Sequence, residues 1–224
     1  MHGFLLIDKP ENWTSHDVVA YLRGALKIKK IGHAGTLDPF ATGLLVVAIA
    51  REATKRLDEF KGMPKTYVTT LQFGATTDTY DKTGEITRTA RDFTLDKVQL
   101  TKTLESFIGK QLQIPPMYSA KKVQGKKLYE LARKGIEIER KPSEIEIFDI
   151  KLLQTTDTTA TIEVSCSTGT YIRTLCQDIG QKLGLGAYCE SLRRIKIGNF
   201  SVDKAIHPKE ISKDNIERSI LTNV

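Results

Sequence analysis

Residues 32–45 read GHAGTLDPFATGLL. The stretch places a single carboxylate, Asp38, directly before a proline, with glycines on both sides and an apolar run after it. Glycine permits backbone conformations that other residues avoid, and proline fixes the direction of a turn. The stretch therefore predicts a turn that holds one acidic side chain in place and leads into a buried strand at residues 44–50. An Asp-Pro pair that merely starts a turn is the simpler alternative.

The elements around this turn mix helices and strands. Residues 3–10 predict a strand that ends at Pro10, and Thr14 and Asp17 have the spacing of a capping box before a helix over about 15–27. Further strands are predicted at 66–74, 144–153 and 159–166, with a loop at 75–85. Further helices are predicted at 53–60, ending at Gly62, at 95–108 and at 170–183. The apolar face of the helix at 95–108 is assigned to Val98, Leu104, Phe107 and Ile108. Because no strand-helix-strand rhythm connects them, we expect an α+β fold around a largely antiparallel sheet, with residues 144–153 and 159–166 as antiparallel neighbours.

Composition limits the class of protein. The chain has 224 residues, and its hydrophobic fraction of 40% suffices for a core. The longest apolar run, residues 44–50, is far shorter than the roughly 20 residues of a membrane helix, and the amino terminus lacks the order of a signal peptide. We therefore expect a cytoplasmic protein. Three cysteines without a CxxC pair and four scattered histidines favour neither a disulfide framework nor a metal centre.

The positive charge is concentrated in one segment. The formal net charge is +7, and residues 121–141 alone contribute +5. A basic cluster of this kind is typical of a polyanion-binding surface, and equally of a solvated helix face.

Six motifs taken together identify a family. They are GHAGTLDPFATGLL, KTY at 65–67, TDTYD at 77–81, PPMYSAKKVQGKKLYELARKGIE at 115–137, STGTYIRTLCQDIG at 167–180 and SLRRIKIGNF at 191–200. In this order they resemble the TruB family of RNA pseudouridine synthases, and the resemblance covers roughly residues 3–206. It implies a pseudouridine synthase fold without cofactor or metal that isomerises uridine at position 55, in the T-loop of tRNA.

The resemblance makes Asp38 the catalytic carboxylate. The reaction breaks the glycosidic bond, turns the uracil and joins C5 to C1′, and an ionised carboxylate serves either as nucleophile or as proton acceptor from the sugar. These two routes stay open. Arg173 stands at the start of a predicted helix, and a nearby guanidinium typically lowers an aspartate pKa by about 1 to 3 units, so we predict an Asp38–Arg173 pair. The resemblance implies that Tyr67 stacks on the target base and takes the C5 proton.

The resemblance also suggests substrate-binding residues. Asp81 is expected to form hydrogen bonds near Arg173 and Tyr67, and Leu192 to contact the uracil. The lone histidine of GHAG, His33, invites a general-base role because histidine titrates near neutrality, but the resemblance implies that it fills the space left by the flipped nucleotide. Lys9 is expected to support the active-site loop. Tyr171 completes this group.

The basic segment corresponds to a thumb insertion at about 119–142. We expect it to close over the RNA stem-loop, with phosphate contacts from the lysines of its first half: Lys121, Lys122, Lys126 and Lys127.

From the resemblance we expect residues 1–224 to form one catalytic domain, without the carboxy-terminal PUA domain of longer relatives. We expect tRNA as the partner, no obligate protein partner, and a monomer. A guide-dependent relative that modifies ribosomal RNA inside a ribonucleoprotein and a non-catalytic RNA-binding module that helps tRNA to fold are the alternatives.

Overall fold

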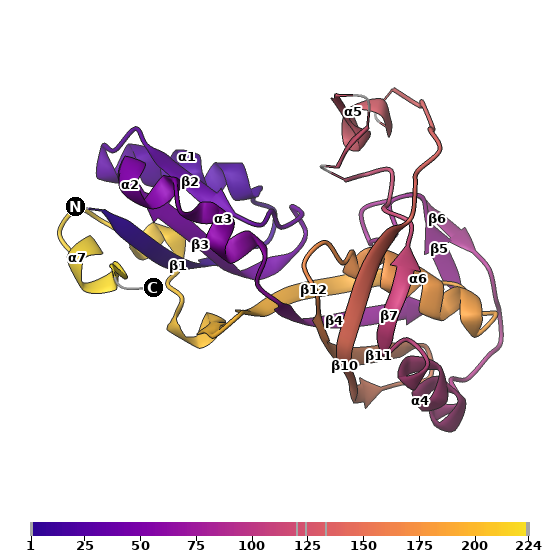
Figure 1. Cartoon of the computed structure of the whole chain (residues 1–224). Coiled ribbons are helices and arrows are strands. Elements are labelled where there is room, and N and C mark those ends of the chain that lie inside the picture. The colour runs from indigo at the N-terminus through magenta and orange to yellow at the C-terminus, as the bar shows by residue number, and fades with distance from the viewer. Residues whose placement is uncertain (1, 120, 124, 133, 223–224) are drawn as a thin grey trace. The chain divides into compact units, whose positions relative to one another are not determined.

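A computed structural model describes residues 2–119, 121–123, 125–132 and 134–222. The side chains of residues 122, 123, 126 and 127 lie outside this description. The chain divides into two compact units: unit 1 contains Met1–Val68 and Leu192–Val224, and unit 2 contains Thr69–Ser191. Figure 1 labels the helices and strands of both units. No helix within the described residues is long and apolar enough to cross a membrane.

Unit 1 is built around strand β3 (Thr42–Ile49), the buried strand that the sequence predicts at 44–50. Strand β1 (Gly3–Lys9) pairs antiparallel with it, as does the short β2 (Ile31–Ala34). Strand β12 (Ala187–Ile197) pairs in parallel with the start of β3. The connection between β2 and β3 is the predicted turn, so the sheet itself fixes both ends of the segment that carries Asp38.

Helices cover both faces of this sheet, as Figure 1 shows. The odd-numbered side chains of β3 from Leu45 to Ile49 join a core with α1 (Ser15–Leu26). The even-numbered ones from Leu44 to Ala48 join a second core with α2 (Ala50–Thr54) and α3 (Leu57–Lys61). Because successive side chains of a strand point to opposite faces, a strand buried on both faces reads as a continuous apolar run.

Helix α1 begins as predicted. The Thr14 side chain accepts from the Asp17 N–H, and the Asp17 carboxylate accepts from the Thr14 N–H, which completes the capping box. This arrangement satisfies two backbone donors that the first turn of a helix leaves open.

In unit 2 the strands follow the order β12, β4 (Lys65–Phe73), β11 (Thr159–Cys166), β10 (Ser143–Thr155) and β7 (Gly109–Gln113). Strands β10 and β11 are antiparallel neighbours, as predicted, and so are β10 and β7. A separate hairpin contains β5 (Ala75–Thr77) and β6 (Ile86–Arg88). Helix α6 (Ile172–Lys182) follows β11.

The thumb segment lies between β7 and β10 (Figure 1). It contains the hairpin strands β8 (Lys122–Val123) and β9 (Lys126–Lys127) and the short helix α5 (Leu128–Ala132), whose Leu128 is fully buried. The carboxy-terminal part of the chain adds the two-residue strand β13 (Phe200–Ser201), the 3-10 helices η1 (Val202–Lys204) and η2 (Pro208–Glu210), and α7 (Ile216–Ser219).

The α+β prediction is confirmed, with three corrections in detail. The helix expected over 53–60 is two short helices, because the backbone of Arg56 (φ −94°, ψ 2°) leaves the helical region. The helix expected over 95–108 is the shorter α4 (Lys97–Glu105), and two residues assigned to its apolar face, Val98 and Ile108, are 64% and 46% exposed. Leu104, which was assigned to the same face, is buried, together with Leu100 and Thr103. Part of the expected loop at 75–85 is strand β5.

Candidate active site

The turn that carries Asp38 is anchored by its neighbours. Asp38 is half-buried, whereas Leu37 and Phe40 on either side are 3% and 4% exposed. The Ala41 N–H closes the turn by donating to the Asp38 carbonyl (3.1 Å). Ser15, at the start of α1, accepts from the Leu37 N–H at 2.9 Å and donates to the Leu37 carbonyl at 3.3 Å. These contacts tie the turn to the amino terminus of α1.

Lys9 holds the next residue of the turn. Its side chain is fully buried, and its Nζ donates to the carbonyls of Pro10, Trp13 and Pro39 at 2.9, 2.5 and 3.2 Å. Burial lowers the pKa of Lys9 from 10.5 to about 8, and the negative charge of Asp38 acts against this shift. Lys9 therefore remains charged at neutral pH, where its ammonium and the Asp38 carboxylate attract each other.

Arg194 on β12 fastens both ends of the same segment. It is 1% exposed, and its guanidinium donates to the Leu44 carbonyl at 2.7 Å and to the Gly35 carbonyl at 2.9 Å. Gly43 crosses the Arg194 backbone so closely that a Cβ there would lie 2.3 Å from the Arg194 carbonyl oxygen, and its φ is +100°. This glycine is therefore required by the contact between β3 and β12.

His33 lies on β2 and is half-buried. Burial lowers its pKa, and the positive charge of Arg194 adds to the effect. Within the described part of the chain, no hydrogen-bond partner reaches its buried Nδ1. The imidazole is therefore neutral at neutral pH, which suits a packing role.

Two further predicted residues lie on strands. Tyr67 is on β4 and is 9% exposed, and the alternation along this strand puts it on the same face as Lys65. Leu192 is on β12 and is 7% exposed.

In unit 2, Arg173 sits in a nearly closed polar site. It is the second residue of α6 and is 3% exposed. Its Nη1 lies 3.3 Å from Asp81 Oδ2 and donates to the Thr79 carbonyl at 2.7 Å. Its Nη2 donates to the Tyr118 carbonyl at 2.7 Å. Because the cation is buried, each of these acceptors offsets the cost of burying it and helps to orient it.

Asp81 is the ion-pair partner in this site. Its other oxygen, Oδ1, accepts from the Thr79 hydroxyl and from both the N–H and the hydroxyl of Thr83, at 2.9, 2.9 and 2.5 Å. Both oxygens of the buried carboxylate are thus used within unit 2, which fits a residue that positions Arg173.

Tyr171 is fixed through its backbone. The Gln113 side chain accepts from the Tyr171 N–H at 2.8 Å and donates to its carbonyl at 3.0 Å. Tyr171 is the residue directly before α6, so Gln113 sets the start of the helix that carries Arg173.

The predicted site residues are divided between the two units. Asp38, Tyr67, His33, Lys9 and Leu192 belong to unit 1, and Asp81, Tyr171 and Arg173 belong to unit 2. The Asp38–Arg173 pair stays a prediction.

Of the four thumb lysines, Lys121 has a described side chain. Its Nζ donates to the Ser143 hydroxyl of β10 at 2.5 Å, which ties the base of the thumb to the sheet. Lys122, Lys126 and Lys127 have a described backbone in β8 and β9, and their side chains lie outside the description.

Comparison with known families shows what this framework belongs to. The model of the TruB family pseudouridylate synthase N-terminal domain matches residues 23–172. The chain belongs to the TruB family. The model of the tRNA pseudouridylate synthase B C-terminal domain matches residues 173–221. The family predicted from the six motifs is thereby confirmed, and with it the prediction of an enzyme, an isomerase.

Individual members of the TruB family are similar along nearly the whole chain. Proteins named tRNA pseudouridine synthase B from Clostridium tetani, Aquifex aeolicus and Syntrophomonas wolfei are 43%, 46% and 47% identical. Each comparison covers 99% of this chain and 76 to 77% of the relative.

A solved structure shares the fold. A chain in the crystal structure of a Cbf5-Nop10-Gar1 complex superposes with a TM-score of 0.71 and is 28% identical. The match covers 92% of this chain and 52% of the other, so this chain spans about half of that protein. The pseudouridine synthase fold expected from the motifs is therefore confirmed.

Sequence reasoning missed three residues that hold the TruB framework in place. Ser15 and Arg194 fix the Asp38 turn, and Gln113 fixes the start of α6. The paired arginines of SLRRI are a signal that could have indicated Arg194. No local pattern marks Gln113.

Proposed function

We propose that this protein isomerises uridine to pseudouridine at position 55, in the T-loop of tRNA, with Asp38 as the catalytic carboxylate. One observation carries the proposal. Relatives named tRNA pseudouridine synthase B are 43 to 47% identical over 99% of this chain. That similarity favours a tRNA substrate over the ribosomal RNA alternative.

The chemistry needs one well-placed carboxylate. In the isomerisation the N1–C1′ bond breaks, the C5–C1′ bond forms, C5 loses its hydrogen and N1 gains a proton. No electrons and no external group are exchanged, so the atoms balance without a co-reactant. Asp38 acts as nucleophile or as proton acceptor from the sugar, and both routes require it to be ionised. The attraction between Asp38 and the charged Lys9 supports the ionised form.

The other predicted residues receive roles around Asp38. Tyr67 stacks on the uracil and accepts the C5 proton, and Arg173 supplies a cation for Asp38. Asp81 and Tyr171 position Arg173. His33 and Leu192 fill space beside the flipped nucleotide. Flipping costs a few kcal/mol and is easiest where the base already lies in a loop, which favours a T-loop uridine.

The proposal extends to the setting of the enzyme. Both units together form one catalytic domain, with residues 119–142 as its thumb over the RNA. The enzyme works in the cytoplasm as a monomer without an obligate protein partner.

Release of tritium from the uracil C5 tests the proposed substrate position. A tRNA transcript tritiated at uridine C5 should release about one equivalent of tritium per tRNA into water, because the product carries no hydrogen at that carbon. The same transcript with cytidine at position 55 should release none. No tritium release from the first transcript, or equal release from both transcripts, would overturn the proposal.

A further inference from the structure

Unit 2 contains a pocket that none of the predicted site residues lines. Its volume is about 460 Å³, within the range of about 300 to 1,000 Å³ that is common for small-ligand sites. It lies where β4 ends and β5 begins, and the segment after β6 forms one wall. Its lining includes Gln72, Arg88, Arg91, Asp92 and Phe93.

The wall of the pocket is fixed by a glycine. The Gly74 carbonyl accepts from the N–H groups of Thr89 and Ala90 at 2.9 and 3.2 Å, which ties the segment after β6 to the end of β4. Gly74 has φ +89°, and a Cβ there would lie 2.6 Å from a ring carbon of Phe93. The half-buried Phe93 ring therefore packs over this glycine and gives the pocket an aromatic surface in a set place.

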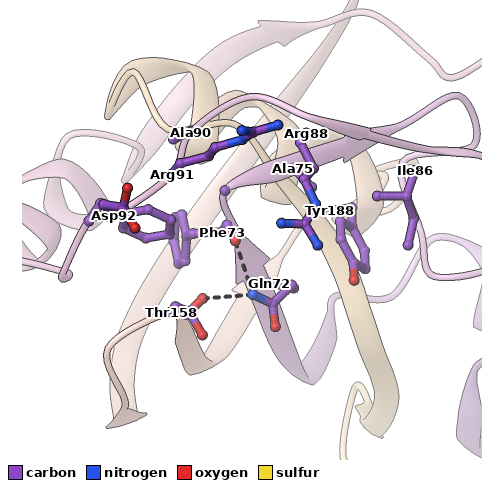
Figure 2. A pocket seen from close by; sticks show the side chains of 12 residues that line it. Gln72, Phe73, Ala75, Ile86, Arg88, Ala90, Arg91, Asp92, Thr158 and Tyr188 are labelled. Carbon is purple, nitrogen blue, oxygen red and sulfur yellow. Dashed lines mark hydrogen bonds between the residues drawn. The ribbon is translucent and has the colours of Figure 1, made fainter.

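The floor of the pocket offers an oriented amide. Gln72 Nε2 donates to the carbonyls of Phe73 and Thr158 at 3.0 and 3.3 Å, as Figure 2 shows. Both donors of the amide are thereby directed to backbone, and within the described residues Oε1 has no hydrogen bond. An acceptor of this kind can recognise the N–H edge of a nucleobase.

The lining is also positively charged. Arg88 and Arg91 are exposed and line the pocket, and Figure 2 shows their side chains. Among the described residues, neither guanidinium has a hydrogen bond or an ion pair. Asp92 contributes one negative charge, so these three residues leave a net charge of +1. Guanidinium groups match the geometry of phosphate oxygens, and their exposure lets a strand enter and leave the pocket.

We propose that this pocket binds one nucleotide of the RNA substrate other than the isomerised uridine. The base packs against Phe93 within reach of Gln72, and the adjoining phosphate meets Arg88 and Arg91. The inference rests on the proposed function, because it takes the RNA substrate to be tRNA. Aromatic stacking with cationic phosphate contacts is a common way to hold a single-stranded nucleotide.

A footprint on tRNA tests the proposal. In the Arg88→Gln/Arg91→Gln double variant, hydroxyl radicals should cleave at least one tRNA nucleotide, away from position 55, that the unmodified protein protects. The slope of log affinity against log salt should become shallower by about 1 to 2, because each lost phosphate contact contributes about 0.7 to 0.9. The Lys102→Gln/Lys110→Gln variant is the matched control, since it removes two exposed positive charges of unit 2 that do not line the pocket.

A second variant tests the base. Phe93→Leu keeps the apolar volume and removes the aromatic face, so tRNA affinity should fall about fivefold or more, from the usual contribution of stacking. An unchanged footprint and slope in the arginine variant would overturn the proposal, as would equal losses in the lysine control. So would binding of free UMP in the pocket without any effect of these variants on tRNA binding. Tritium release by the unmodified protein is measured separately, so failure of the proposed function is distinguishable from failure of the pocket.

Discussion

At the scale of single residues, the framework depends on buried charges whose hydrogen bonds are satisfied. Lys9 and Arg194 lie under the Asp38 turn, and Asp81 faces Arg173 in unit 2. A buried charge is costly unless it is paired or hydrogen-bonded. Each of these side chains donates hydrogen bonds to, or accepts them from, groups beside a predicted site residue. Burying these charges therefore costs free energy, and their hydrogen bonds hold the site residues in place.

Lys9 should give the stability of the protein a recognisable pH dependence. Below pH 8 both the folded and the unfolded chain hold its proton; between pH 8 and 10.5 only the unfolded chain does. The free energy of unfolding that depends on Lys9 therefore rises with pH across this window. The difference between wild type and Lys9→Met should increase by roughly 1 to 3 kcal/mol from pH 7 to pH 10, at about 1.36 kcal/mol per pKa unit.

Urea unfolding at several pH values measures this difference. Lys102→Met is the control, because it also removes one lysine, but an exposed one. A difference for Lys9→Met that stays flat, or falls as the pH rises, would show that burial does not disfavour the charged form.

Asp81→Asn removes the negative charge that lies 3.3 Å from the buried Arg173 guanidinium. Breaking a buried pair in this way costs about 3 to 5 kcal/mol, so the urea midpoint should fall clearly. Asp78→Asn is the matched control in the same loop, because Asp78 is exposed, and it should change stability by less than about 0.5 kcal/mol. A similar loss of stability in both variants would mean that the Asp81–Arg173 ion pair does not stabilise the protein more than an exposed aspartate does.

At the scale of elements, Gly43 tests the contact between β3 and β12, and Gly24, which has open space around it, serves as the control. Gly43→Ala should destabilise the protein by at least about 2 kcal/mol, because the new Cβ strikes the Arg194 backbone at a positive φ. Gly24→Ala in α1 meets nothing within 4 Å and should stabilise it by about 0.5 to 1 kcal/mol. Thermal unfolding compares them, and a Gly43→Ala protein as stable as wild type would refute the contact.

Elements with strong local signals were predictable from the sequence. The capping box of Thr14 and Asp17 begins α1, and the apolar run at 44–50 is β3 within two residues. Both depend on neighbours in the chain. Strands β2, β7 and β12 were not predicted. Strand β2 has only four residues, and β7 and β12 pair with strands that lie 30 and 151 positions away. For Val98, a helical period alone did not decide which of two adjacent faces is buried.

In the candidate site, too, local features were predictable and long-range contacts were not. The turn around Asp38 and the start of the helix at Arg173 were expected from short motifs. The contacts that hold them were not: Arg194 bonds a carbonyl 150 positions away, and Gln113 bonds Tyr171, 58 positions away. Periodicity and capping rules describe only local geometry, so side-chain bonds across such separations need the folded chain.

At the scale of the whole molecule, the net charge of +7 predicts salt-sensitive binding of RNA, with most of the excess in the thumb. Replacing Lys122, Lys126 and Lys127 by Gln should make the slope of log affinity against log salt shallower by about 2 to 3. Lys121 is spared because it bonds Ser143. Filter binding at several salt concentrations measures the slope.

The matched control for this thumb variant replaces three exposed lysines elsewhere in unit 2, Lys102, Lys110 and Lys151. Equal slopes for the two triple variants would show that position does not matter and would remove the thumb from RNA binding.

The central claim is that the carboxylate of Asp38 performs the isomerisation. Tritium release from C5-tritiated tRNA by Asp38→Asn is the most direct measurement, because this variant keeps the size of the side chain and loses its charge. The rate should fall at least about a hundredfold to ten-thousandfold, as loss of a group that acts chemically does, while tRNA binding and the urea midpoint stay close to wild type. Release within a few-fold of the wild-type rate would contradict the account.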